Sequence, residues 1–350
     1  MSTRPRNFDA AVVGAGPSGA VCALLLARAG ARVGLIHRAD SRVRGVELIS
    51  GRARRLVERH REDFFRLAVH GVEVRETVSL WGTPDPVTWN AMLDPWGPGV
   101  AVDRAAFDGA LRDLASDAGA TILPAAEVLG CGRRGARWCL DLRREAGSCT
   151  MSAGLLIVAT GRGGGRFLNR AAAARSTHVA LMTRLRARGC RQGHALYLEA
   201  SDNGWWYALP DRGGGHFVGL CVGRDEARRR RAPLREFFVR ELRRTRLLAP
   251  LLPNAEVDQP ILGRPAGVQA PDQVAGPGWV AVGDAAFAPD PLSGMGLDFA
   301  LESAVRAAGA VRPGVASENF GDYEQWVAAY AWQHAGAREL YYRADAVSQN

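Results

Sequence analysis

The sequence contains no lysine, so each of its 45 lysine-plus-arginine positions is an arginine. Chemistry that needs a lysine amine is therefore excluded, including Schiff bases, the phosphate-binding lysine of a P-loop and a catalytic ammonium group. The formal net charge of +9 would suit an acidic partner. This charge is densest at Arg228–Arg231, Arg235, Arg240, Arg243, Arg244 and Arg246. A solvated helix face is the simpler interpretation of this run, and no nucleic-acid-binding motif accompanies it.

Cysteine is scarce, and no two cysteines form a CxxC pair. The six are Cys22, Cys131, Cys139, Cys149, Cys190 and Cys221. Their scatter argues against a disulfide framework or a zinc site, so we predict reduced thiols and no metal. Long apolar runs are also missing, and residues 1–7 are polar and basic, unlike a secretory signal. We expect a cytoplasmic protein that binds neither membrane nor nucleic acid.

The first forty residues follow a strand–turn–helix–strand pattern. Phe8–Val13 is a short apolar run, Gly19–Arg28 is rich in alanine and leucine, and Arg32–Ile36 is a second apolar run. The turn between strand and helix carries a GxGxxG motif. Its residues are Gly14, Ala15, Gly16, Pro17, Ser18 and Gly19. This context predicts a dinucleotide-binding loop that places a pyrophosphate at the helix N-terminus.

One expected feature of a dinucleotide site is absent. An acidic residue at the end of the second strand would bind the adenosine ribose, but His37 and Arg38 stand there. A histidine can hydrogen-bond a hydroxyl group, and an arginine can stack on adenine. The departure predicts looser adenosine binding, and a plain surface role for His37 is equally compatible with its position.

The remaining pattern predicts a split nucleotide-binding domain with an inserted sheet. We expect a helix over Asp103–Ala118 and buried strands at Leu155–Val158 and Gly278–Val282. Between them, four short strands separated by turns indicate an antiparallel sheet: His178–Leu185, His194–Glu199, Trp205–Leu209 and His216–Val222. We expect helices at Gly294–Ala308 and Tyr323–Tyr342. The predicted division is 1–175 and 263–350 for the nucleotide domain with its C-terminal helix, 176–262 for a substrate domain, and a substrate-side contribution from 70–100.

A second motif follows the strand that ends at Val282. It contains Gly283 and Asp284, then Asp290, Pro291, Leu292, Ser293, Gly294, Met295, Gly296 and Leu297 at the start of a helix. An aspartate at a strand end can accept hydrogen bonds from ribityl hydroxyls. A glycine-rich helix start can direct amides and its dipole at the flavin N1–C2=O edge. Folds that bind NAD need no such element, so the motif predicts FAD.

These motifs together resemble the p-hydroxybenzoate hydroxylase superfamily of FAD-dependent monooxygenases and halogenases, over nearly the whole chain. The Val158–Gly161 segment and the helix that begins with Asp103 and Arg104 are also similar to this family. The resemblance implies an α/β fold with a split Rossmann-type FAD-binding domain, an inserted antiparallel sheet and a C-terminal helix. It also implies cofactor contacts from Gly161, Asp284 and Arg104, the last near the phosphates.

Within the family, Gly45–Leu48 and Trp205–Pro210 resemble signatures of tryptophan-halogenase-like members. Halogenation is disfavoured, because halogenases of this type use a lysine and a PLES sequence, whereas this chain reads Pro291-Leu292-Ser293-Gly294. The chain is most similar to flavoproteins that mature tryptophylquinone enzymes, of the lysine-oxidase maturation type. That resemblance implies a monooxygenase that hydroxylates a tryptophan side chain of a peptide or protein through a flavin C4a-hydroperoxide.

The implied partners are molecular oxygen, a peptide or protein substrate that could carry an acidic leader, and a source of electrons. The electrons come from NAD(P)H or a separate flavin reductase; the sequence has no second dinucleotide motif that would decide between them. Three alternatives stay open. They are a monooxygenase of a free small aromatic, a flavin-dependent reductase of isoprenoid double bonds, and a flavin fold kept only for partner binding.

Two carboxylates and several aromatic residues are candidates for the chemistry. Glu47 and Asp290 could act as a general base, although a loop carboxylate is more often solvated or a helix cap. Strand alternation places Trp205 and Tyr207 on one face and Trp206 on the other, where we expect it in the core. Substrate contacts are predicted for Trp205, Tyr207, Trp81 and Phe287, and Trp81, Trp89 and Trp96 fall in a stretch that could form a substrate-side loop.

Overall fold

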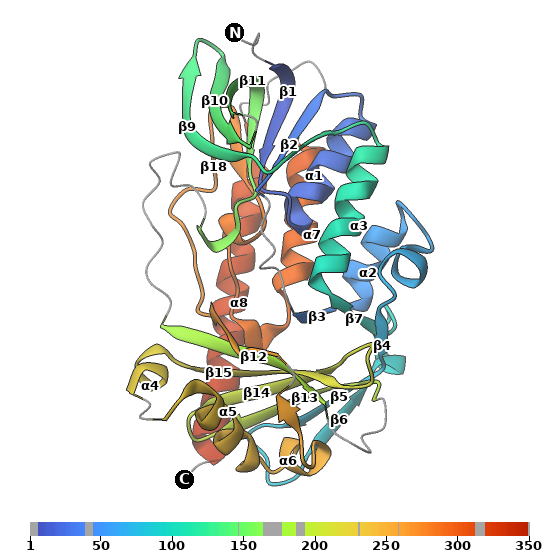
Figure 1. The fold of residues 1–350 in the computed structure, drawn as a ribbon, viewed down its shortest axis with the longest axis vertical. Helices are drawn as coiled ribbons and strands as arrows, with labels where there is room; N and C mark the ends of the chain where they lie inside the picture. Colours follow the sequence, from blue (N-terminus) through green and yellow to red (C-terminus); the bar gives the residue numbers. More distant parts are fainter. Residues whose placement is uncertain are drawn as a thin grey trace.

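The computed structural model describes residues 6–38, 45–145, 147–163, 177–186, 193–229, 232–257, 259–311 and 319–348. Cys190, Arg230 and Arg231, which the sequence analysis singled out, lie outside these residues. The described chain forms two large sheets joined by a small third sheet and by a long C-terminal helix (Figure 1).

The first large sheet has a parallel core in the order β19-β11-β1-β2-β8. Its parallel strands are β1 (Arg6–Val13), β2 (Val33–His37), β8 (Thr121–Pro124), β11 (Gly147–Val158) and β19 (Trp279–Ala281). The antiparallel strands β9 (Glu127–Arg134), β10 (Arg137–Arg144) and β18 (Ala275–Gly276) complete it. Because β1 is central, both of its faces are covered, and Ala10 to Val13 are all buried.

Three helices pack together beside this parallel core (Figure 1). They are α1 (Pro17–Arg28), α3 (Arg104–Asp117) and α7 (Gly296–Gly309), with α1 in contact with the other two. Asp103 caps α3 by accepting hydrogen bonds from Ala105 N (2.9 Å) and Ala106 N (3.2 Å). Asp103 is therefore the N-cap of α3, and the helix begins directly after it.

The second large sheet has the order β16-β12-β15-β14-β13-β5-β6, with β17 also paired to β12. Its strands are β5 (Glu76–Leu80), β6 (Val87–Asn90), β12 (His178–Arg186), β13 (Ala195–Ser201), β14 (Gly204–Pro210), β15 (His216–Gly223), β16 (Glu256–Val257) and β17 (Leu262–Pro265). The pairing is antiparallel except between β13 and β5. Helices α4 (Arg224–Arg229), α5 (Leu234–Arg243) and α6 (Leu248–Leu251) follow β15.

Two further elements connect the sheets. The small sheet β3-β7-β4 consists of Val46–Ile49, Gly99–Asp103 and Val72–Val74, next to α2 (Gly51–Glu58). The C-terminal helix α8 (Gly321–Ser348) runs from the parallel sheet to the second sheet (Figure 1). Near its start, Tyr323 donates a hydrogen bond to Ala281 O of β19 at 2.7 Å. Near its end, Tyr342 OH accepts one from Trp205 Nε1 of β14 at 3.2 Å.

This architecture confirms the predicted α/β fold with a parallel Rossmann-type sheet, an antiparallel sheet and a C-terminal helix. The sequence pattern did not predict the small sheet, because its strands are short and their partners lie far apart in the sequence. The expected strand Leu155–Val158 is the last part of a longer strand, β11 (Gly147–Val158). We propose that the two large sheets mark the two domains of the predicted division. No helix of the described chain is long and apolar enough to span a membrane.

Candidate functional site

The glycine motif lies between β1 and α1, as predicted. Gly14 has a φ of +106°, and a Cβ there would lie 2.2 Å from Ala159 O, so only glycine fits. At Gly19 a Cβ would lie 1.9 Å from Gly14 O, which explains the close packing of helix and strand. Gly16, by contrast, has no atom within 4 Å of its Cβ position. As the N-cap of α1 it makes no side-chain cap, so the first amides of the helix are available to an anion.

Of the two residues that follow Gly16, only the second can offer a backbone N–H, because proline has none. Pro17 and Ser18 are buried in the first turn of α1. The Ser18 hydroxyl faces Gly283, where a Cβ would lie only 2.5 Å from Ser18 Oγ. The side chain of Ser18 therefore packs the first motif against the second, and only its N–H remains to bind a phosphate.

The adenosine end of the site has histidine and arginine where an acid was expected. His37 ends β2 half-buried, and Arg38 follows it on the surface. Burial and the nearby Arg112 guanidinium lower the pKa of His37, so its ring is neutral near pH 7 and can bond a hydroxyl. Arg112 on α3 also reaches the glycine motif, donating to Ala15 O at 3.4 Å. We did not predict Arg112; its place on the helix that packs against α1 was the available signal.

Arg104 lies at the start of α3 between two carboxylates. Its Nε and Nη2 bond both oxygens of Asp108 at 3.0 and 3.1 Å, and its Nη1 lies 2.6 Å from Glu47 Oε1. Asp108 is buried, and this desolvation raises its pKa against the opposing effect of Arg104. Glu47 is half-exposed and belongs to β3, so the ion pair fixes its carboxylate at the edge of the site. Its role as a general base stays a prediction.

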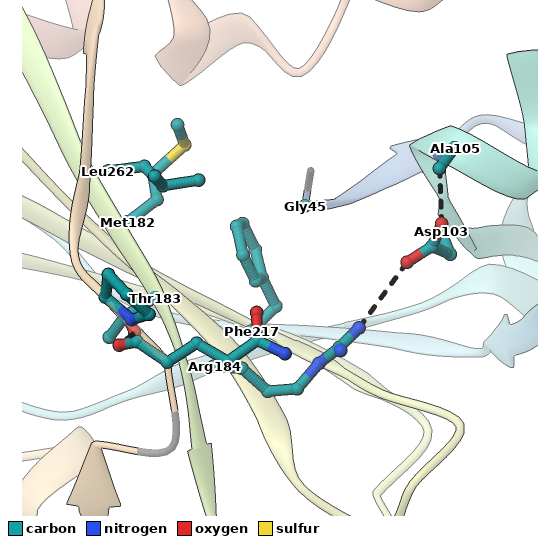
Figure 2. A pocket seen from close by; sticks show the side chains of 10 residues that line it. Gly45, Asp103, Ala105, Met182, Thr183, Arg184, Phe217 and Leu262 are labelled. Atoms are coloured by element: carbon teal, nitrogen blue, oxygen red, sulfur yellow. Dashed lines mark hydrogen bonds and ion pairs between the residues drawn. The ribbon is translucent and has the colours of Figure 1, made fainter. Parts of the chain in front are cut away.

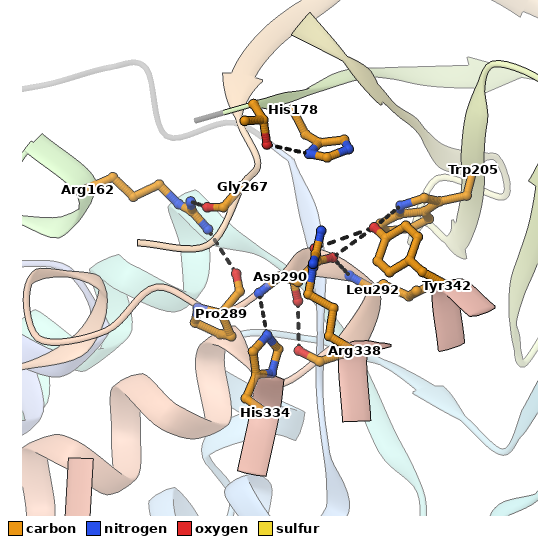
Figure 3. A network of polar contacts seen from close by, with 12 residues as sticks. Arg162, His178, Trp205, Gly267, Pro289, Asp290, Leu292, His334, Arg338 and Tyr342 are labelled. Carbon is orange, nitrogen blue, oxygen red and sulfur yellow. Dashed lines mark hydrogen bonds and ion pairs between the residues drawn. The ribbon is translucent and has the colours of Figure 1, made fainter. Parts of the chain in front are cut away.

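Asp284, predicted to bind a ribityl hydroxyl, follows β19 in the turn Gly283–Ala285. Its Oδ2 lies 3.2 Å from Arg162 Nε. Burial raises the pKa of Asp284, while the Arg162 charge opposes the shift. Arg162 also donates to Gly267 O and, at 3.1 Å, to Pro289 O (Figure 3). The sequence analysis missed Arg162, although it directly follows the Val158–Gly161 segment that resembles the family.

The second glycine-rich segment begins α7. Gly294 has a φ of +64°, and Gly294 and Gly296 have no atom within 4 Å of their Cβ positions; the same holds for Gly161 after β11. Pro291 starts a short turn, and Met295 is the N-cap of α7 without a side-chain cap. The Leu297 side chain is buried in the core, so only its backbone can face a cofactor. The open glycines leave room for a flat group at the helix start.

Asp290 is held by the C-terminal helix (Figure 3). Its carboxylate accepts hydrogen bonds from Arg338 Nε at 2.8 Å and from Leu292 N at 3.0 Å, and Tyr342 OH lies 3.4 Å from both oxygens. Its backbone N–H donates to His334 Nε2 at 2.9 Å. The carboxylate therefore caps the following turn and pairs with an arginine. This arrangement supports the helix-cap interpretation, and the predicted role of Asp290 as a base finds no support in it.

An aromatic cluster covers the face of the second sheet that meets the glycine-rich segment at Leu292. Trp205 and Tyr207 lie on one face of β14 and Trp206 on the other, where Trp206 packs against Phe238 of α5. The strand alternation that we predicted is confirmed. Trp205 contacts Tyr207 and Trp81, with ring centroids 6.0 and 6.3 Å apart. Trp81 Nε1 also donates to Tyr341 O of α8 at 2.8 Å.

The predicted substrate residues thus divide into two groups. Trp81, Trp205 and Tyr207 pack in one cluster with Leu292 of the glycine-rich segment. Gly219 on the neighbouring strand makes room for the Tyr207 ring. Phe287 is 1% exposed and packs against Phe299, Tyr330 and His334, so its predicted substrate contact is not supported: it is a core residue between α7 and α8.

The predicted substrate-side loop is only partly near the site. Trp81 joins the aromatic cluster, whereas Trp89 is 68% and Trp96 45% exposed. Trp89 belongs to β6, which pairs only with β5 at the edge of the sheet. Neither Trp89 nor Trp96 contacts the cluster around Trp205 in the described structure.

A cavity of about 400 Å³ lies between the first part of α3 and the second sheet (Figure 2). Gly45, Asp103 and Ala105 line it on one side. The other side is formed by Met182, Thr183, Arg184, Phe217, Gln259, Pro260 and Leu262. Arg184 pairs with Asp211 at 2.6 Å and with Asp103 at 3.5 Å. The cavity is therefore lined by both polar and apolar groups, and its charged residues Arg184 and Asp103 are paired with each other, which is compatible with an uncharged ring.

The two glycine motifs and the residues between them fit an FAD molecule. An open helix start beside β1 suits a pyrophosphate, and a second open helix start beside an aromatic sheet suits an isoalloxazine ring. The family model described as "FAD dependent oxidoreductase" matches residues 9–174. The chain is an FAD-dependent oxidoreductase. FAD is therefore the cofactor of this flavoprotein.

Individual relatives extend this likeness over most of the flavoprotein. It is 27% identical to LodB of Marinomonas mediterranea, described as an FAD-dependent oxidoreductase, over 85% of this chain and 83% of LodB. The solved structure of CmlS, a flavin-dependent halogenase, matches 97% of this chain with a TM-score of 0.76 and 25% identity. This chain covers 64% of CmlS, somewhat less than two thirds of its length. QhpG, a peptidyl tryptophan dihydroxylase, matches 98% of this chain and 76% of its own, with a TM-score of 0.72 and 23% identity.

Proposed function

We propose that this flavoprotein is a monooxygenase that hydroxylates a tryptophan side chain within a peptide or protein. The observation that carries the proposal is the juxtaposition of the aromatic cluster Trp81–Trp205–Tyr207 with the glycine-rich segment through Leu292. An electron-rich ring seated there would be flanked by aromatic faces, which favour offset or edge-on packing. The likeness to LodB over most of the chain and the fold shared with QhpG support the same class of reaction.

The reaction requires the protein to position the substrate ring and to exclude water from the reacting groups. When bound, FAD supplies the electrons and the activation of molecular oxygen. Trp205 and Tyr207 would orient the substrate ring, and Tyr207 stays protonated because burial raises its pKa. Glu47, held by Arg104 at 2.6 Å, is the carboxylate we propose to take up the ring proton. NAD(P)H or a separate flavin reductase would supply these electrons to FAD.

The cavity beside α3 adjoins the aromatic cluster at Met182, which belongs to both, and it is consistent with a side chain as the substrate. Its volume of about 400 Å³ lies at the lower end of ligand pockets and accommodates an aromatic side chain with little else. A free small aromatic fits the same volume, so oxygenation of a free aromatic is the second candidate. Halogenation stays disfavoured, because the chain has no lysine to handle a hypohalous acid.

The test is oxygen transfer followed by mass spectrometry. Purified FAD-loaded protein would be mixed with a flavin reductase, NAD(P)H, O₂ and tryptophan-containing peptides, and in parallel with free tryptophan and phenols. The proposal expects a gain of about 16 Da per oxygen on a peptide tryptophan, labelled when ¹⁸O₂ replaces O₂. Oxygenation of free aromatics alone would establish the second candidate. Anaerobic reduction of an isoprenoid double bond without any oxygenation would refute both.

A further inference from the structure

Helix α5 presents a basic face to solvent on the side of the second sheet away from the flavin. Phe237, Phe238 and Leu242 point inward and join the core formed with Trp206. The exposed face carries Arg235, Arg240, Arg243 and Arg244, with Glu236 as its one acidic residue. The charge run found in the sequence is therefore one side of an amphipathic helix that covers the outer face of the sheet.

Among the described residues, two of these four arginines have an ion-pair partner and two do not. Arg240 pairs with Glu241 at 3.0 Å, and Arg244 pairs with Asp202 at 3.3 Å. Arg235 and Arg243 form no ion pair with any residue that the structure describes. Two unpaired guanidinium groups on one helix face are available to bind carboxylates.

An apolar cavity adjoins the N-terminal end of this face. It has a volume of about 410 Å³ and is lined by Leu234, Arg235, Val257, Gln259, Pro260 and Ile261. Gln259 and Pro260 also line the cavity beside α3, so both cavities adjoin the same short segment. This segment is fixed to β12, where Thr183 Oγ1 donates to Gln259 O at 2.7 Å.

We propose that the basic face of α5 and its adjoining cavity form a docking site for an acidic and apolar segment of the polypeptide substrate. The inference rests on the proposed function. Carboxylates of the segment would bind Arg235 and Arg243, and an aliphatic side chain would enter the cavity lined by Leu234 and Ile261. Because an extended chain advances about 3.3 Å per residue, a few residues would then lead across Pro260 toward the cavity beside α3.

The face fits a polypeptide better than other anionic partners. Base stacking on single-stranded nucleic acid needs exposed aromatic side chains. The large exposed apolar residues of the described chain lie elsewhere, none of them within Arg224–Leu251. The same absence removes the apolar wedge by which a basic helix inserts into a membrane surface. Unpaired arginines beside an open apolar cavity match a short segment that mixes acidic and aliphatic residues.

The test measures binding without turnover. A short fluorescein-labelled peptide of alternating glutamate and leucine would be titrated with FAD-loaded protein, and compared with the peptides in which glutamine replaces glutamate or serine replaces leucine. The variant is R235E/R243E. The charge-matched control is R59E/R134E, whose two exposed arginines lie on α2's end and on β9. We expect about tenfold weaker binding of the acidic peptide by the first variant and less than twofold by the control.

Salt and competing ligands complete the design. Binding of the acidic peptide should weaken as salt rises, because exposed charges are screened. Equal losses in both variants, or equal binding of the glutamine peptide, would overturn the docking site. Tighter binding of RNA or of phosphatidylglycerol vesicles through the same two arginines would overturn it in favour of those partners. If the site holds and no tryptophan is oxygenated in any peptide, the proposed function fails and the docking site stands.

Discussion

The ion pair between Arg338 and Asp290 should stabilise the flavin segment, and its removal has a predictable magnitude. Breaking a buried pair by removing one partner costs about 3–5 kcal/mol. The Asp290 side chain is 3% exposed, but that of Arg338 is 38% exposed, so water would solvate the carboxylate left by Arg338→Met. Leu292 N and Tyr342 OH also remain as donors. We therefore expect a loss of about 2 kcal/mol, less than the full cost of a buried pair.

The assay is thermal unfolding of the FAD-loaded and FAD-free protein. In a chain of this size the loss corresponds to a fall of about 3 °C in Tm. Arg343→Met is a matched control, because Arg343 pairs with Glu339 on the same helix at an exposed position. Such exposed pairs contribute about 0.3–0.5 kcal/mol. The variant Arg338→Met should also weaken FAD binding, because Asp290 caps the turn before Gly294. Equal melting of the two variants would refute this reasoning.

Three further predictions follow from the same contacts. Gly16→Val should abolish FAD binding with little change in apo-protein Tm, whereas Gly14→Ala should lower the Tm itself, because its Cβ meets a backbone carbonyl. His334 accepts the Asp290 N–H only when neutral, and burial lowers its pKa. Its contribution is full above about pH 6.5 and is lost as pH falls below that value, because the unfolded chain takes up the proton first. His334→Gln keeps an acceptor and should flatten that pH dependence of Tm; an unchanged profile would contradict the assignment. Arg104→Lys should lower FAD affinity, measured by flavin fluorescence. One ammonium group cannot hold both oxygens of Asp108 and also Glu47, so the residue that we predict near the cofactor phosphates would lose its position. Wild-type affinity would contradict this.

The sequence predicted the parts of the fold whose signals are local. The GxGxxG motif lies in one stretch between two apolar runs, and the alternation of Trp205, Trp206 and Tyr207 is set by the strand period alone. The structure contains both the predicted glycine turn and the predicted strand alternation. The small sheet was not predicted, because Val46–Ile49 and Gly99–Asp103 pair across about fifty residues and no single hairpin turn joins them.

The site was harder to predict because its polar contacts join distant segments. Arg162 meets Asp284, and Arg338 meets Asp290, across gaps that no pattern within one stretch can show. The prediction for Phe287 shows a different kind of error, in which a local signal indicated a contact that the structure does not support. Its position beside the glycine-rich segment indicated a substrate contact, but α8 covers it with Tyr330 and His334. A terminal helix that returns to the site is visible only in three dimensions.

A chain without lysine holds each of these carboxylates with an arginine. Glu47 and Asp108 pair with Arg104, Asp284 with Arg162, and Asp290 with Arg338. Each of these guanidinium groups is neutralised by its partner, so none is left to oppose the negative charge of a reduced flavin. We propose that the uncapped N-terminus of α7 has that role, since Asp298 in its first turn accepts hydrogen bonds from Ser50. The open position of Gly296 would then let the cofactor approach the amides at this helix start closely enough for their charge to act.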